Sequence, residues 1–161
     1  DRALLSLKSN DFPIYYLSPR GVKLDAQISN SISKLDGMTL VCGKYEGVDE
    51  RVIKHYNMIE ISIGDYILSG GDLAAMVLID SVVRCLPNVL GNPLTLNEES
   101  FTNHLLEYPL YTQPREWKNY KVPDVLLSGD HKKIKNWKIK QSEDITMKRR
   151  PDLWKKYLKL K

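Results

Sequence analysis

The sequence predicts an α/β domain built on a parallel sheet, followed by a small basic helical C-terminal domain. Short apolar strands alternate with helical patterns through the first half of the chain, which is typical of parallel β-α-β units. Residues 131–161 then hold 12 Lys and Arg against 3 Asp and Glu, a net charge of +9, whereas residues 1–130 hold 12 against 17, a net charge of −5. We therefore expect two parts of opposite charge.

The totals fit one globular domain with an appendage. A chain of 161 residues can bury a core, and 42% hydrophobic with 27% charged residues is an ordinary composition. No apolar run approaches the ~20 residues that cross a bilayer, and no signal peptide is recognisable, so we expect a cytoplasmic protein without membrane contact. Cys42 and Cys85 lack CxxC spacing, and we expect reduced thiols in the core. Because the chain begins with Asp1, we expect that upstream residues are missing.

The elements of the first half follow from hydrophobic spacing. Apolar runs predict strands over residues 13–17, 38–42 and 58–63. The second run is almost entirely apolar, as expected in a sheet covered on both faces. Residues 18–21, with Pro and Gly, predict a turn that ends the first strand, and apolar residues at helical spacing predict a helix over residues 23–34. The chain order is therefore β-α-β.

A glycine-rich loop, residues 62–72, stands at the end of the third predicted strand. Gly64, Gly70 and Gly71 can take positive φ and allow another molecule close to the backbone. A similar glycine-flanked loop, residues 43–51, follows the second strand. Open α/β sheets bind ligands at the carboxyl ends of their strands, so the two loops predict a joint site.

Neither loop is specific when taken alone. A strand, a glycine turn and a capped helix also build many ordinary α/β units, and Tyr45 and Glu46 also fit a packing aromatic and a surface acid.

The helix predicted over residues 72–86 is apolar almost all round, and we expect Asp72 to cap it. Such a helix is buried on more than one side, within a thick core or a subunit interface. Arg84 is a charge in this apolar setting. It fits an interface salt bridge, or a contact with an anionic or acceptor-rich substrate.

The domain boundary is expected in the polar stretch that follows this helix. We predict a first domain over residues 1–91, a connector over 92–104 and a helical domain over 105–161. A basic helix is predicted over residues 131–141, and residues 148–154 are expected to begin the last helix. Nucleic-acid binding and a solvated helical face account equally well for the positive charge.

Four runs in series resemble a known family: CGKYEGVDERV, SIGDYILSGGDLAAMVLIDSVVR, VPDVLLSGDHKKIKNW and KRRPDLW. They are similar to bacterial tRNA (guanine-N1)-methyltransferases, which modify the guanosine 3′ of the anticodon, and the similarity covers residues 15–154 in order. The resemblance implies S-adenosylmethionine as methyl donor, tRNA as partner, and a homodimer whose sites take the knot from one subunit and the connector from the other. It also implies a trefoil-knotted SPOUT-class domain, an exception to the rule against knots, shortened here at its amino terminus.

The resemblance further implies a donor site made of three loops. Two of them are the loops that the sheet argument selects. The donor-binding residues that it implies are Tyr16, Leu17, Ser18, Pro19, Gly43, Tyr45, Glu46, Ile63, Gly64, Asp65, Tyr66, Ile67, Leu68, Gly70 and Gly71, with Glu107 near the sulfonium.

Methyl transfer to guanine N1 must also remove a proton. The resemblance implies Glu99 as the base, at a position where the family usually has Asp, and Arg84 as the group that steadies the purine as negative charge develops. Glu98 stays an alternative base, and a Mg²⁺ requirement stays open. Leu110 and Gln113 replace family residues that offer RNA or nucleotide contacts. The implied contacts to tRNA phosphates are Lys132, Lys135, Lys138, Arg149 and Arg150.

Two other functions remain open. A noncatalytic RNA-binding protein predicts phosphate-dominated binding without affinity for S-adenosylmethionine. A knotted RNA ribose 2′-O-methyltransferase would modify a hydroxyl and needs no connector carboxylate. A Rossmann-type methyltransferase is disfavoured because no GxGxxG follows an early strand, and a metal enzyme because His55, His104 and His131 are scattered.

Overall fold

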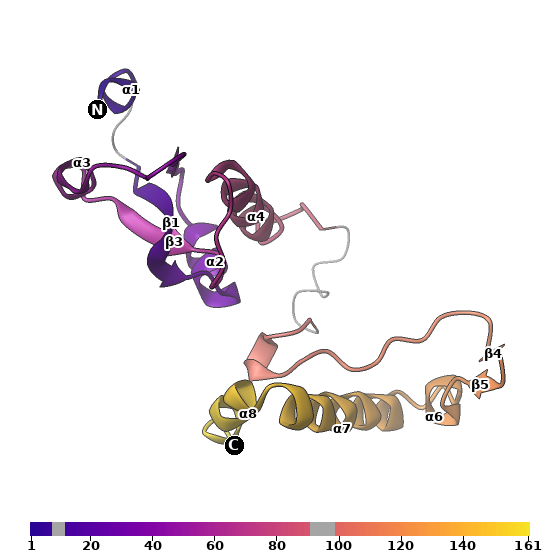
Figure 1. Cartoon of the computed structure of the whole chain (residues 1–161). Helices are drawn as coiled ribbons and strands as arrows, with labels where there is room; N and C mark the ends of the chain where they lie inside the picture. The colour runs from indigo at the N-terminus through magenta and orange to yellow at the C-terminus, as the bar shows by residue number, and fades with distance from the viewer. Residues whose placement is uncertain (8–11, 91–98) are drawn as a thin grey trace. The chain divides into compact units, whose positions relative to one another are not determined.

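The computed structural model describes residues 1–7, 12–90 and 99–161. The chain divides into two compact units, Asp1–Gly91 and Asn92–Lys161 (Figure 1). The first unit contains a parallel sheet with helices, and the second is mainly helical.

A three-stranded parallel sheet with the order β2-β1-β3 organises the first unit. Its strands are β1 (Ile14–Lys23), β2 (Thr39–Cys42) and β3 (Ile59–Ser62). Its helices are α1 (Arg2–Leu5), α2 (Ala26–Ile32), α3 (Glu50–His55) and α4 (Asp72–Val83). The prediction of an α/β class with a parallel sheet is confirmed.

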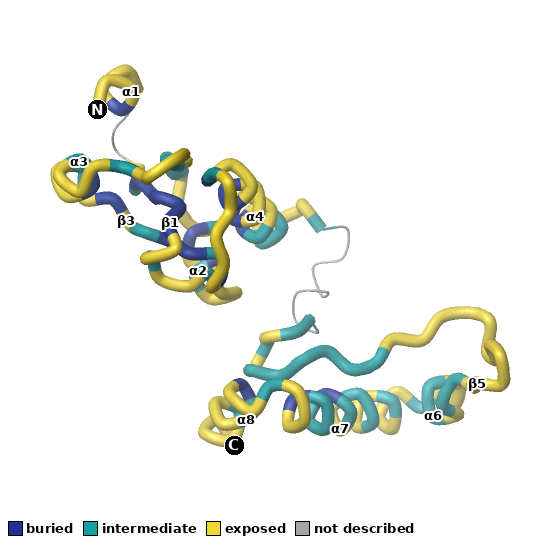
Figure 2. The backbone as a smooth tube through the Cα atoms, viewed as in Figure 1, coloured by how far each residue is buried: buried dark blue, intermediate teal, exposed yellow. Residues whose placement is uncertain are grey.

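Both faces of the sheet are covered because side chains alternate along β1. Tyr15 and Leu17 belong to one apolar cluster, which includes Leu78 of α4 and residues of α2. Ile14 and Tyr16 belong to the opposite cluster, with residues of α1 and α3. Figure 2 shows the buried first half of β1 in dark blue. Cover on two faces is therefore seen at β1, whereas β2, the strand from which it was predicted, is only half-buried.

Strand β1 is longer than predicted, and the prediction of a turn over residues 18–21 is wrong. The strand continues to Lys23, while its pairing with β3 shifts between Leu17 and Val22. The intervening residues form an irregularity in the ladder rather than its end. Gly21 makes this arrangement possible, since a Cβ there would lie 2.3 Å from the backbone carbon of Glu60.

The ends of helices α2 and α4 differ from the predictions. Helix α2 begins after Asp25, whose carboxylate accepts a hydrogen bond from the Ile28 amide at 2.9 Å. Helix α4 has Gly71 as its N-cap, so the prediction that Asp72 caps the helix is wrong. Asp72 lies in the first turn, where a carboxylate still stabilises the helix dipole. The helix ends at Val83, with Arg84 in the C-cap position.

Within the described chain, helix α4 buries one face only (Figure 2). Its buried residues are Ala74, Ala75, Leu78 and Val82. Its exposed apolar residues are Leu73, Met76, Val77, Ile79 and Val83. The predicted burial on more than one side is therefore not met by this chain alone. The prediction of two core thiols is also wrong, because Cys42 is exposed and Cys85 is half-buried.

The second unit is built around one long helix. Its elements are η1 (Thr102–His104), β4 (Glu116–Trp117), β5 (Tyr120–Lys121), α6 (Asp124–Leu127), α7 (His131–Arg149) and α8 (Pro151–Leu158). Helix α7 runs eight residues past the predicted end at Gln141, and α8 begins at Pro151, a favoured first helical residue, instead of near Lys148. Among the helices of the described residues, none has the length and apolar character of a membrane span.

Candidate functional site

A pocket of about 380 Å³ lies in the first unit, beside the ends of β2 and β3 and the middle of β1. The walls come from three segments: the irregular part of β1, the loop after β2 and the loop after β3. This volume falls within the range of small-molecule sites. The two loops predicted to form a joint site do line a single cavity.

Most of the residues implied as donor-binding line this pocket: Tyr16, Leu17, Ser18, Pro19, Gly43, Tyr45, Glu46, Ile63, Gly64, Tyr66, Ile67, Leu68, Gly70 and Gly71. Asp65 is not among the lining residues; its carboxylate pairs with Lys23 Nζ at 3.2 Å. Glu107 belongs to the second unit. Arg20 and Lys44 also line the pocket and were not among the residues implied as donor-binding.

Two hydrogen-bonded contacts join the loop after β2 to the loop after β3. The Gly71 amide donates to the Gly43 carbonyl at 2.8 Å, and Lys44 forms an isolated bridge with Gly70. A Cβ on Gly71 would lie 2.9 Å from the Cα of Cys42 and 3.0 Å from the nitrogen of Gly43. Glycine is therefore required at position 71, because the backbones approach too closely for a side chain.

The loop after β3 starts with a tight turn. The buried Ser62 hydroxyl accepts a hydrogen bond from the Gly64 amide at 3.2 Å and donates to the Gly64 carbonyl at 3.1 Å. Gly64 has φ of 153°, and a Cβ there would lie 2.5 Å from the Tyr66 ring. The turn leads into Tyr66 and Ile67, whose side chains are exposed while both residues line the pocket. The loop thus offers apolar surface to a ligand.

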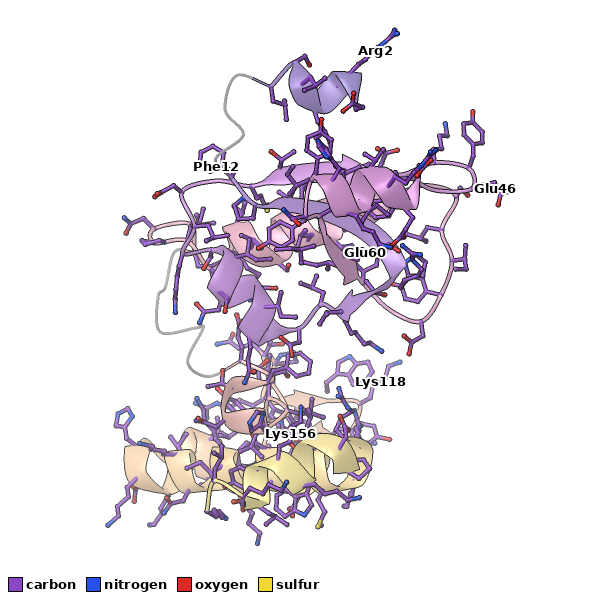
Figure 3. All side chains as sticks on the ribbon, turned by 90° about the vertical axis from the view of Figure 1, so that its left-hand side faces the viewer. Arg2, Phe12, Glu46, Glu60, Lys118 and Lys156 are labelled. Atoms are coloured by element: carbon purple, nitrogen blue, oxygen red, sulfur yellow. The ribbon has the colours of Figure 1, made fainter. Side chains whose placement is uncertain are left out.

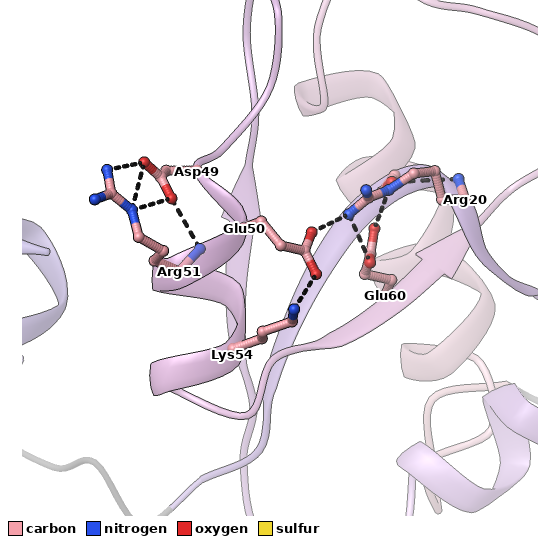
Figure 4. Close-up of polar contacts among 7 residues, drawn as sticks. Arg20, Asp49, Glu50, Arg51, Lys54 and Glu60 are labelled. Atoms are coloured by element: carbon pink, nitrogen blue, oxygen red, sulfur yellow. Dashed lines mark hydrogen bonds and ion pairs between the residues drawn. The ribbon is translucent and has the colours of Figure 1, made fainter.

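Arg20 connects the irregular part of β1 to two neighbouring elements (Figure 4). Its guanidinium donates to both carboxylate oxygens of Glu60 in β3, at 2.9 and 3.2 Å, and to Glu50 of α3 at 3.0 Å. Two-pronged contacts between Arg and carboxylate fix direction as well as distance. The hydrogen bond from Arg20 is the main reason that the pKa of Glu50 is lowered. Arg20 therefore holds one wall of the pocket.

The presence of Arg20 in the pocket could have been predicted from its neighbours in the sequence. It follows Ser18 and Pro19, which were assigned to the donor site, but the prediction of a turn gave its side chain no partner. Glu46, which was predicted, projects from the loop after β2 and is exposed (Figure 3). The pocket therefore combines apolar side chains, glycine backbone, one carboxylate and two cations.

The two residues implied in catalysis lie in different units. Arg84 follows α4 in the first unit and is half-buried. Glu99 lines a second pocket, of about 420 Å³, together with Tyr108 and Lys138. Glu98, the alternative base, lies outside the described residues.

The residues implied in tRNA binding lie on α7 or directly after it. Lys138 Nζ lies 4.4 Å from the centre of the Tyr108 ring, a cation–π contact. Arg150 pairs with Asp152 at 2.6 Å, which lowers the pKa of that carboxyl to about 2. Lys132 and Arg149 are exposed. Thus Lys138 and Arg150 contact other side chains of the protein, whereas Lys132 and Arg149 are exposed to solvent.

Comparison with known proteins finds one family over nearly the whole chain. Residues 1–156 match the model of the family described as tRNA (Guanine-1)-methyltransferase TrmD. The tRNA (guanine-N(1)-)-methyltransferase of Pelagibacter ubique (strain HTCC1062) is 58% identical over 146 residues, which cover 91% of this chain and 64% of the relative.

Two further relatives carry the same name. The protein from Ruegeria pomeroyi is 51% identical over 149 residues, covering 92% of this chain and 61% of its own length. The protein from Rhodospirillum rubrum is 51% identical over 158 residues, covering 98% and 66%. The chain therefore spans slightly less than two thirds of the length of these relatives.

Proposed function

Because the chain belongs to the tRNA (Guanine-1)-methyltransferase family, we propose that it transfers a methyl group from S-adenosylmethionine to N1 of the guanosine 3′ of the anticodon in tRNA. The observation that carries this proposal is the pocket of the first unit. Loops from two strand ends meet there through the hydrogen bond between Gly71 and Gly43, and the matched family model includes all of the lining residues.

The residues of the pocket fit S-adenosylmethionine. Leu17, Ile63 and Leu68 supply apolar surface for the faces of a purine, and the backbone groups of the loop after β3 can pair with its edge. The Glu46 carboxylate suits a cationic ligand. When bound, S-adenosylmethionine supplies an electrophilic methyl group. The protein contributes alignment of the two substrates and exclusion of water.

The proposal includes a trefoil knot of the SPOUT class in the first unit. Its support is the close approach of backbone segments that lie far apart in the sequence. Gly71 passes against Cys42 and Gly43, and Gly21 passes against the backbone of Glu60. A knotted domain requires close approaches of this kind, and a parallel sheet without a knot also allows them.

Proton removal falls to the connector in this proposal. The Glu99 carboxylate takes the N1 proton, and Arg84 donates hydrogen bonds to the purine as it gains negative charge. Glu107 is held near Glu99 in sequence and structure, since its amide donates to the Ser100 hydroxyl at 2.9 Å. One compact loop of the second unit therefore carries both acids.

A homodimer completes the proposed site. The exposed apolar face of α4 is the support, because a second subunit would remove it from water. Each site would then combine the pocket of one subunit with the connector of its partner. We also propose a cytoplasmic location, which a tRNA substrate would favour. The cations of α7 would contact tRNA phosphates.

A methylation assay tests the proposal. Isothermal titration should show saturable binding of S-adenosylmethionine, and tRNA transcripts with guanosine 3′ of the anticodon should gain a methyl group that stops reverse transcription at that position. Transcripts with adenosine there should not react, and the assay is run with and without Mg²⁺. RNA binding without donor binding would favour a noncatalytic RNA-binding protein, and a methyl group on a ribose would favour the 2′-O-methyltransferase.

The identity of the base is tested by a pair of neighbouring variants. Glu99→Gln should lower turnover by about 10²-fold or more while leaving donor affinity unchanged, because only the proton acceptor is lost. Glu98→Gln is the matched control and should retain most of the activity. Equal losses in single-turnover rates would refute the choice of Glu99.

A further inference from the structure

The hairpin of β4 and β5 carries a pair of exposed aromatic rings. Trp117 and Tyr120 face each other across the hairpin, with ring centres 6.4 Å apart and planes at 28°. Trp117 is 59% exposed and Tyr120 is 75% exposed. The two rings cover each other in part, and most of their surface faces water.

Local sequence explains why this hairpin forms. Lys118 and Asn119 have φ of 47° and 68°, the paired positive values of a two-residue hairpin turn. The Val122 amide donates to the Arg115 carbonyl at 2.9 Å and extends the hairpin by one more contact. A two-stranded hairpin this short is marginal in water, so the aromatic pair is its main side-chain support. Support of the hairpin occupies only one face of each ring.

Positive charge surrounds the two rings. Arg115, Lys118 and Lys121 are exposed, against one acid, Glu116, which lies 3.9 Å from Lys121. The ammonium of Lys118, labelled in Figure 3, lies 5.0 Å from the centre of the Trp117 ring. Exposed aromatic rings between cations match a ligand that has flat apolar faces and negative charge. Unpaired nucleotides of RNA have both properties.

We infer that the hairpin 115–121 is an RNA-binding surface on which an unpaired base stacks against Trp117 or Tyr120. Lys118 and Lys121 contact the phosphates on either side of that base. The surface distinguishes unpaired from paired nucleotides, because the faces of a paired base are covered by its neighbours. The choice of RNA as the ligand rests on the proposed function, whereas the stacking geometry comes from the hairpin itself.

Binding of a tRNA transcript, followed by fluorescence anisotropy, tests this inference. Trp117→Leu and Tyr120→Leu together should weaken binding about ten-fold, because base stacking on an aromatic ring is lost. The single variant Trp117→Phe keeps an aromatic ring at position 117 and leaves Tyr120 unchanged. It should therefore retain most of the affinity for tRNA. The slope of log K against log salt should stay unchanged in the Leu variants, since no phosphate contact is removed.

Variants of lysine residues test the proposed phosphate contacts, through the salt dependence of tRNA binding. Lys118→Ala should reduce the salt slope by about one, as expected for one lost phosphate contact. Lys34→Ala, an exposed lysine of the first unit, is the control and should leave the slope unchanged. Circular dichroism and melting curves of each variant show whether the second unit is still folded.

The outcomes separate this inference from the proposed function. If the protein methylates tRNA and the double Leu variant binds tRNA as tightly as the unmodified chain, the hairpin inference is overturned. If methyl transfer is absent but RNA binding still depends on Trp117, the inference stands and the proposed function fails. Quenching of Trp117 fluorescence by anionic phospholipid vesicles and not by RNA would assign the hairpin to a membrane surface and also overturn it.

Discussion

At Gly71, in the wall of the pocket, the close packing of the backbone leaves no space for even a methyl side chain. Gly71→Ala adds a methyl 2.9 Å from the Cys42 backbone, so the loops must separate. We expect a loss of about 1–3 kcal/mol in unfolding free energy and a loss of donor affinity in calorimetry. At Gly70 an added Cβ would meet nothing closer than 3.8 Å, so Gly70→Ala should keep the melting temperature. Equal melting temperatures for the two variants would contradict the role of close packing at Gly71.

Arg20 holds one wall of the pocket through Glu50 and Glu60, and these carboxylates make its effect on stability pH-dependent. Arg20→Ala should weaken S-adenosylmethionine binding several-fold, because residues 18–21 lose their links to β3 and α3. The change in unfolding free energy should be small, since the Arg20 side chain is 61% exposed. Arg51→Ala is the matched control: Arg51 pairs with Asp49, two residues away, and does not line the pocket. Equal effects on donor affinity would argue against positioning by Arg20.

The pH dependence follows from the lowered pKa of Glu50. A carboxyl with a lowered pKa in the folded state stabilises the fold above its ordinary pKa, and this contribution is lost as the pH falls through the lowered value. The stability difference between the unmodified protein and Arg20→Ala should therefore be constant at neutral and alkaline pH. It should shrink on acidification below the usual Glu range. Urea unfolding at a series of pH values measures it, and a difference that grows on acidification would contradict the assignment.

Among the elements of the second unit, α7 is joined to the preceding chain by a buried hydroxyl. Thr146 has no exposed surface; its hydroxyl donates to the Ser142 carbonyl at 2.6 Å and accepts from the Leu106 amide at 2.8 Å. Thr146→Val keeps the shape but leaves that amide without its acceptor, which should cost about 1–3 kcal/mol. Thr146→Ser keeps both hydrogen bonds. Hydrogen exchange at Leu106 should become fast in the Val variant only, and protection in both variants would refute the contact.

Periodicity located the elements of the first unit well and their ends less well. The apolar strands and helices were predicted because each buries a face whose spacing is visible in the sequence. The continuation of β1 through Pro19 and Gly21 was not, because it depends on how β3 packs against Gly21. Helix α7 was predicted too short for a similar reason. Its second half is polar in sequence and is stabilised by contacts such as that of Thr146 with Leu106.

At the scale of the whole molecule, the location of the pocket was easier to predict than the residues that stabilise its walls. Glycine loops at strand ends indicated a site, and the resemblance gave most of its lining. Arg20 was missed because its partners, Glu50 and Glu60, lie 30 and 40 residues away. The exposed face of α4 was predicted to be buried in a core or in a subunit interface, because apolar composition alone does not distinguish the two.

A shared site between two subunits can be tested by mixing two inactive variants. Glu46→Ala impairs the pocket in the proposed function, and Glu99→Gln removes the proposed base. If each site takes its pocket from one subunit and its connector from the other, a hybrid dimer contains one site with both lesions and one site with neither. Half of the dimers in an equal mixture are hybrids, so about a quarter of the unmodified activity should return.

Co-expression of the two chains with different affinity tags would isolate the hybrids, and methyl transfer to tRNA would then be measured against each parent. Sites that use both residues from one subunit would each carry a single lesion in the hybrid. Such hybrids would remain as inactive as their parents, which would place Glu99 beside the pocket of its own chain. Recovered activity would instead require a dimer with shared sites, because only such a dimer unites an intact pocket with an intact connector.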